Sequence, residues 1–117
     1  MEHSVTTDGD CVVIALHGDI DLQYSTAARD VMLQAVGDLQ ATDEVLAVFV
    51  DMSGVGMIDS SGVASLLEAL QETRKRGKRF ILCAVDPSVD RVLRLARLET
   101  VFEIADTAEA ARQSLTE

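Results

Sequence analysis

The sequence predicts a single α/β domain, built on a mixed sheet of about four to five strands packed with about four helices. Three observations lead to this prediction. The 117 residues are enough for one ordinary domain, and 48% of them are hydrophobic. After an opening hairpin pattern, segments with the periodicity of strands alternate with segments of helical periodicity. We therefore assign residues 1–117 to one domain, with an N-terminal hairpin followed by parallel strands.

The chain opens with the hairpin. Apolar residues on both sides of the turn signal Asp8-Gly9-Asp10 predict two antiparallel strands, the second over 11–18. The period then changes, and residues 25–39 carry apolar side chains at helical spacing. We expect an amphipathic helix there, capped by Ser25 or Thr26.

The continuous apolar run 45–50 is typical of a strand covered on both faces, and residues 79–85 are predicted to form a second buried strand. Between them, residues 63–70 carry a helical apolar stripe, and Gly77 supplies a stop signal for that helix. The order of strand, helix and strand predicts a parallel, right-handed unit. We expect the basic run 74–79 to be a solvated helix end, and contact with an acidic partner is the less favoured alternative.

The last part of the sequence predicts two more helices with a strand between them. Asp86-Pro87 supplies an N-cap and a first helical position. A short apolar strand is expected at 101–104. Asp106 with Glu109 resembles a capping box for the final helix, which we expect to end near Leu115.

The charge balance disfavours several classes of function. Lys and Arg number 10 and Asp and Glu number 20, a net charge of −10, which is unfavourable for binding nucleic acid or an anionic membrane. The apolar runs are much shorter than the roughly 20 residues of a membrane-spanning helix, so we expect no direct membrane insertion. The first residues lack the pattern of a secretory signal, and we expect a cytoplasmic protein.

The residues that could bind a metal are few. Cys11 and Cys83 each lie inside an apolar run, where a buried free thiol is expected. His3 and His17 are too scattered to form a ligand cluster with each other or with a cysteine. We assign no metal and no cofactor.

The most unusual segment is the loop 51–62, which follows the first buried strand. Functional groups of open α/β sheets gather beyond the carboxyl ends of the strands. Ser60 lies where the next helix should begin, so we expect its hydroxyl to be exposed beside unpaired amides that favour a phosphate. A plain N-cap is the simpler interpretation from the residues alone. No Gly-x-Ser-x-Gly elbow surrounds Ser60 and only His17 could act as its base, so an enzyme is not expected.

Two motifs stand out, one after the hairpin and one within this loop. Gly18-Asp19-Ile20-Asp21 follows the hairpin, and Asp51-Met52-Ser53-Gly54-Val55 leads to Ile58-Asp59-Ser60-Ser61-Gly62 at the end of the loop. Together with residues 82–89, these motifs resemble the STAS family, and within it the bacterial anti-sigma factor antagonists. The resemblance covers nearly the whole chain.

The resemblance implies a role for each residue of the second motif. Ser60 would be phosphorylated by a partner anti-sigma factor that is an ATP-dependent serine kinase, and a serine phosphatase would be a further partner. Asp21, Asp59, Ser61 and Gly62 would form the partner-binding surface with Ser60, and Asp59 would also shape the loop. The unmodified chain would bind the anti-sigma factor and free the sigma factor, while phosphate on Ser60 would release the partner.

Two other functions remain open. The chain could be the accessory STAS subunit of an ABC-type membrane transport complex, docked on an ATPase without need of a phosphate. It could also belong to a partner-switching pathway whose output is secretion, motility or biofilm control instead of transcription. The intact Asp59-Ser60-Ser61-Gly62 motif favours a phosphate switch over the transport role.

Overall fold

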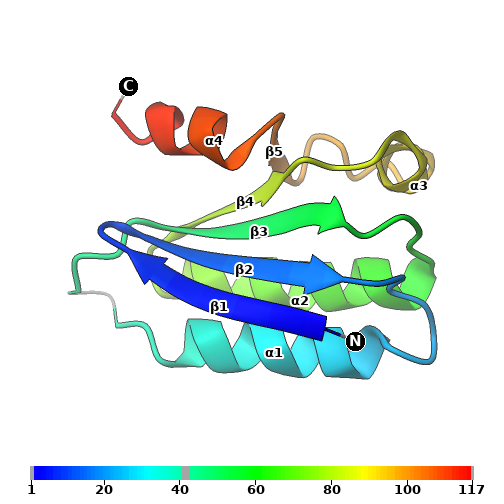
Figure 1. Cartoon of the computed structure of the whole chain (residues 1–117), viewed down its shortest axis with the longest axis horizontal. Coiled ribbons are helices and arrows are strands. Elements are labelled where there is room, and N and C mark those ends of the chain that lie inside the picture. The colour runs from blue at the N-terminus through cyan, green and yellow to red at the C-terminus, as the bar shows by residue number, and fades with distance from the viewer. Residues whose placement is uncertain (1, 41–42, 117) are drawn as a thin grey trace.

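Within residues 2–40 and 43–116, which the computed structural model describes, the chain forms a five-stranded sheet and four helices (Figure 1). The strands follow one another across the sheet in chain order. The elements are β1 (Glu2–Asp8), β2 (Cys11–His17), α1 (Ser25–Gly37), β3 (Ala47–Gly54), α2 (Ser60–Lys75), β4 (Arg79–Cys83), α3 (Pro87–Leu95), β5 (Glu103–Ala105) and α4 (Ala108–Ser114).

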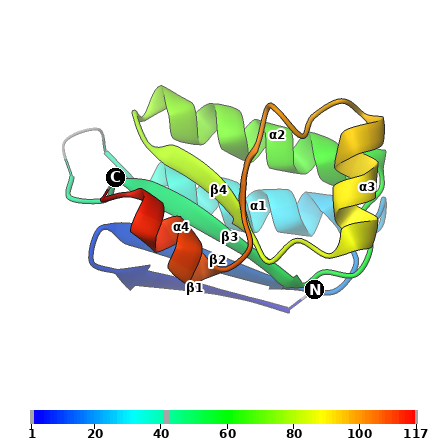
Figure 2. The ribbon, with the colours of Figure 1, turned by 90° about the horizontal axis from the view of Figure 1, so that it is seen from above.

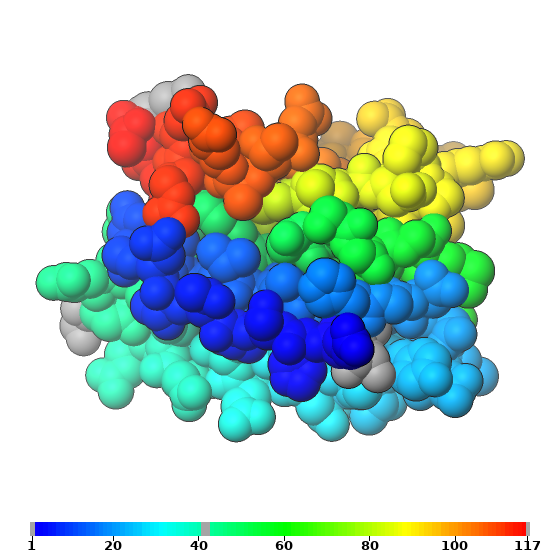
Figure 3. All heavy atoms as spheres, viewed as in Figure 1, coloured from blue at the N-terminus to red at the C-terminus, as the bar shows by residue number. Residues whose placement is uncertain are grey.

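The sheet is mixed, as the sequence predicts. Strand β1 pairs with β2 in antiparallel orientation, and β2, β3, β4 and β5 are parallel to one another. Gly9 makes the hairpin turn with φ +62°, a left-handed conformation that glycine adopts without a steric cost. Strand β1 is exposed along its whole length and forms one edge of the sheet, in dark blue at the front of Figure 3.

The core lies on both faces of the sheet. Helices α1 and α2 cover one face, on which Ile14 of β2 and Val50 of β3 are fully buried. Helix α4 lies over the other face, as Figures 1 and 2 show, and Ala111 packs there with Phe49. Burial on both faces accounts for the continuous apolar run of β3.

Cys11 and Cys83 are both free and buried in the smaller core, which confirms the prediction. Burial raises the pKa of each thiol to about 11. Both side chains therefore stay protonated at neutral pH and act as small apolar residues.

Two predicted helix caps are wrong, because each helix has a different N-cap residue from the one expected. Tyr24 is the N-cap of α1 and makes no side-chain cap, so neither Ser25 nor Thr26 caps the helix. The preceding turn is held by Asp21, whose carbonyl oxygen accepts from the Ser25 amide at 2.8 Å. In α4 the cap is Thr107, whose hydroxyl accepts from the amide of Ala110 at 3.0 Å.

Asp106 therefore lies outside the last helix and caps nothing there. The strand predicted at 101–104 also shifts, to Glu103–Ala105, because the amides of Val101 and Phe102 bond to the carbonyl oxygen of Leu98 in a turn. The cap predicted at Asp86, with Pro87 in the first turn of α3, is confirmed.

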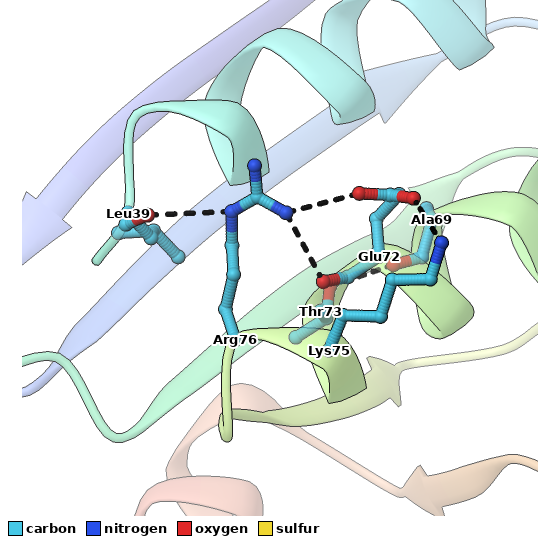
Figure 4. A network of polar contacts seen from close by, with 6 residues as sticks. All are labelled: Leu39, Ala69, Glu72, Thr73, Lys75 and Arg76. Atoms are coloured by element: carbon cyan, nitrogen blue, oxygen red, sulfur yellow. Dashed lines mark hydrogen bonds and ion pairs between the residues drawn. The ribbon is translucent and has the colours of Figure 1, made fainter. Parts of the chain in front are cut away.

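The basic run after α2 is not simply solvated, which corrects the prediction. Figure 4 shows Arg76 between α1 and α2, where it donates to the Leu39 carbonyl at 3.3 Å and to the Glu72 carboxylate at 2.9 Å. The Nζ atom of Lys78 is buried and pairs with Asp43 at 2.6 Å. These cations join the end of α2 to the segments between α1 and β3.

The Lys78 ion pair predicts an acid-sensitive component of stability. The hydrogen bond from Lys78 lowers the pKa of Asp43 below its usual value of 3.8. A carboxyl with a lowered folded-state pKa stabilises the fold above its unfolded pKa, and this stability is lost as pH falls through the folded pKa. We expect Asp43→Asn to lower the unfolding free energy at pH 7, with the gap to the wild type closing below about pH 4. Urea unfolding across this pH range tests the prediction, and a gap that stays constant contradicts it.

Candidate functional site

Ser60 is the first residue of α2, directly beyond the carboxyl end of β3. Its side chain is exposed, and its hydroxyl makes no hydrogen bond with any residue that the structure describes. The hydroxyl is therefore open to a second protein. The plain N-cap interpretation of Ser60 is wrong, because the cap of α2 is the residue before it.

Asp59 caps α2 with an extended backbone and accepts four hydrogen bonds. Its Oδ1 atom accepts from the amides of Ser61 and Gly62, at 2.9 and 3.2 Å, and from the Ser61 hydroxyl at 2.5 Å. Its Oδ2 atom accepts from the amide of Leu22 at 2.9 Å. These bonds, with that of the Ser61 hydroxyl foremost, lower the pKa of Asp59. The side chain is ionised at neutral pH.

The Asp59 cap changes the expected electrostatics of Ser60. The sequence suggested unpaired amides ready for a phosphate, but the Ser61 and Gly62 amides already bind the carboxylate of Asp59. A phosphate on Ser60 would lie beside that negative charge instead of being neutralised by the first turn.

The loop before α1 lies against the loop before α2. Three backbone hydrogen bonds join them: Gly18 N to Gly54 O at 2.9 Å, Ile20 N to Met57 O at 2.9 Å, and Asp59 N to Ile20 O at 3.2 Å. They extend the parallel pairing of β2 and β3 beyond the strand ends. The two sequence motifs are therefore neighbours in space.

Comparison with known proteins decides the family. The model of the STAS domain family matches residues 3–111. This chain belongs to the STAS domain family. The resemblance to the STAS family noted in the sequence is confirmed.

Solved structures of similar shape support the same fold for this STAS domain. An anti-sigma factor antagonist from Mycobacterium paratuberculosis has a TM-score of 0.84 and 22% identity, with 99% of this chain and 94% of that chain covered. An anti-sigma-factor antagonist (STAS) domain protein from Planctomyces limnophilus has a TM-score of 0.84 and 20% identity, covering 98% of each chain. The Bacillus cell fate determinant SpoIIAA in its phosphorylated form has a TM-score of 0.68 and 23% identity, covering 97% and 99%.

Asp21 has a structural function in the STAS domain. It is half-buried, and its Oδ1 atom accepts from the amides of Gln23 and Tyr24 at 3.0 and 3.2 Å. It lies one residue before Leu22, whose amide binds Asp59. The carboxylate of Asp21 therefore shapes the turn before α1, and the adjacent Leu22 links this turn to the start of α2.

Gly62 is buried, in the contact between the first turn of α2 and the neighbouring loop. A Cβ atom at Gly62 would lie 2.4 Å from the carbonyl oxygen of Ile20 and 2.5 Å from a side-chain carbon of Ile58. Only glycine allows the first turn of α2 to approach the neighbouring loop this closely. Gly62 therefore determines where Ser60 lies, and it offers no side chain to a partner.

Exposed apolar side chains near Ser60 were not predicted from the sequence. Leu22 is 80% exposed and Met57 is 47% exposed, and Tyr24 is also among the exposed large hydrophobic residues. The available signal was the presence of large apolar residues inside loops, where no helical or strand period explains them. An exposed apolar patch of this kind is a common feature of protein interfaces.

The described parts of the chain offer little support for other sites. In residues 2–40 and 43–116, no group of three or more His, Cys, Asp and Glu side chains could hold a metal ion. Within the same residues, every helix is too short or too polar to span a bilayer.

The tight contact at Gly62 predicts a sharp stability effect. We expect Gly62→Ala to lower the unfolding free energy by roughly 1–3 kcal/mol, because the added methyl group overpacks a backbone contact. Gly37→Ala is a matched control, since a Cβ atom there meets nothing within 4 Å. Chemical unfolding of both variants tests the prediction. Equal unfolding free energies would contradict it, because they would show that the loop around Ile20 accommodates the methyl group with no loss of stability.

Proposed function

We propose that this STAS domain is an anti-sigma factor antagonist in a partner-switching pathway. In this role the unphosphorylated domain binds an anti-sigma factor serine kinase in the cytoplasm, and the sigma factor is released. Phosphorylation of Ser60 ends this binding, a serine phosphatase restores it, and the domain itself is not an enzyme. The observation that carries the proposal is the exposed, unbonded hydroxyl of Ser60 at the start of α2.

The electrostatics around Ser60 support a switch that acts on the interface. A phosphoserine adds about −1.5 to −2 charge, on a chain of net charge −10 and beside the ionised Asp59. Because Asp59 already binds the first amides of α2, the domain does little to neutralise the new charge. A partner that covers Ser60 therefore meets an excess of negative charge.

The size of this effect is sufficient for a switch. A like-charge contact in an interface costs several kcal/mol. A penalty of about 3 kcal/mol would weaken binding roughly a hundredfold. The exposed Leu22 and Met57 supply apolar area for the unmodified complex, and phosphorylation leaves these side chains unchanged.

Site-specific phosphorylation is the first test. Purified domain is incubated with ATP and each small serine kinase encoded by the source organism, and the modified residue is found by tandem mass spectrometry. We expect phosphate on Ser60, none on Ser60→Ala, and normal modification of the matched control Ser61→Ala. The Ser61 hydroxyl is engaged by Asp59, so it is a poor acceptor. Phosphate on Ser61 alone would refute the assignment.

Binding affinity is the second test. Calorimetry with the same kinase should give tight binding for Ser60→Ala and roughly hundredfold weaker binding for Ser60→Asp. Equal affinities would mean that charge at this position does not control the partner. Binding to a transport ATPase with an affinity that neither substitution changes would favour the accessory-subunit role.

A further inference from the structure

The positive charges of the domain divide into two groups. Of the 10 Lys and Arg residues, all of which are described, Arg91 and Arg97 are the two whose side chains make no hydrogen bond or ion pair within the described chain. Both are exposed. The others are bound to acidic side chains or carbonyl groups of the chain itself: Arg29, Arg74, Lys75, Arg76, Lys78, Arg79, Arg94 and Arg112.

One free arginine, Arg91, lies on the exposed face of α3, and the other, Arg97, follows the C-terminal end of that helix. Ser88, Arg91 and Leu95 are spaced by three and four residues, so they lie along one face of the helix. Leu95 is 76% exposed, whereas Val89 and Leu93 on the inner face are fully buried. We call the surface formed by Ser88, Arg91, Leu95 and Arg97 the α3 stripe.

The α3 stripe begins at the loop that carries Ser60. The Ser88 hydroxyl donates to the carbonyl oxygen of Gly56 at 2.7 Å. The next residue is the exposed Met57. Figure 3 shows α3 (yellow) at the surface beside the segment between β3 and α2 (green). A protein that covers Ser60 and Met57 can therefore reach Arg91 and Leu95 along a continuous surface.

Arg97 has an unusual backbone conformation. It follows the end of α3 with φ +60°, where glycine is the favoured residue. Its amide bonds to the Arg94 carbonyl and the Leu98 amide to the Leu93 carbonyl, which closes the helix. The side chain is exposed and unpaired, so local packing does not explain an arginine at this strained position.

We propose that the partner that covers Ser60 also binds the α3 stripe, through a segment that carries carboxylate groups and an apolar side chain. This inference rests on the proposed function. Arginine binds carboxylates through paired hydrogen bonds, and Leu95 needs an apolar contact to leave water. Phosphate groups of a nucleic acid would also suit Arg91, but the net charge of −10 opposes them. The α3 stripe then contributes to the choice of partner, while Ser60 controls release.

The experiment uses the kinase that phosphorylates Ser60, titrated against full-length domain variants by calorimetry at low and high salt. We expect Arg91→Glu to weaken binding roughly tenfold and to reduce its salt dependence, and Leu95→Ala to weaken it several-fold. Matched controls are Lys75→Glu, with a side chain 71% exposed at the far end of α2, and Leu46→Ala, 50% exposed just before β3. Both controls should bind within twofold of the wild type.

Arg97→Gly separates binding from stability. It relieves the left-handed strain, so the melting temperature should stay equal or rise, while affinity for the kinase falls several-fold. A lower melting temperature with unchanged affinity would show that Arg97 serves only the fold.

The outcomes distinguish this inference from the proposed function. If Arg91→Glu and Leu95→Ala bind like the wild type while Ser60→Asp does not, the α3 stripe is not in the interface and the proposed function stands. If Ser60→Asp binds like the wild type, or no kinase binds the domain, the proposed function fails and this inference with it. Binding of duplex DNA or RNA that depends on Arg91 would overturn the choice of an acidic protein partner.

Discussion

The geometry of the site depends on the carboxylate of Asp59. One oxygen accepts from the first amides of α2 and the other from the amide of Leu22, so a single side chain fixes the helix start relative to the loop before α1. Gly62 allows the two to approach closely enough for these bonds to form. Because both loops are held, Ser60 is presented on a defined surface even though its own side chain is unbonded.

This arrangement differs from that of a helix N-terminus that binds an anion. There, free amides and the helix dipole stabilise a phosphate on the protein. Here Asp59 already uses the amides of Ser61 and Gly62, and the Ser61 hydroxyl as well. The proposed phosphate would therefore alter the surface seen by a partner more than it would alter the fold. This difference suits the proposed switch, which acts on binding to a partner.

Charge serves two purposes in this acidic domain. Arg76 and Lys78 connect the end of α2 to the segments between α1 and β3, and they stabilise the end of the sheet remote from Ser60. The side chains of Arg91 and Arg97 have no such role within the described chain. Arg91 lies on α3, which contacts the Ser60 loop through Ser88, and Arg97 follows the end of that helix. The cations that are free to meet a partner are thus concentrated at the end of the domain where the proposed switch lies.

The sequence alone determined the order and type of the elements, because hydrophobic period, the Asp8-Gly9-Asp10 turn and the Asp86 cap act locally. It also predicted Ser60 as the phosphorylated residue, through motifs that resemble those of the family. It failed at Ser25, because α1 has Tyr24 as its N-cap and no side-chain cap, and at Asp106, because Thr107 is the cap of α4. Only the tertiary structure decided that the Ser61 hydroxyl is engaged and that the two loops meet. Parallel pairing of β2 with β3 joins segments far apart in the chain, and no local pattern encodes that contact.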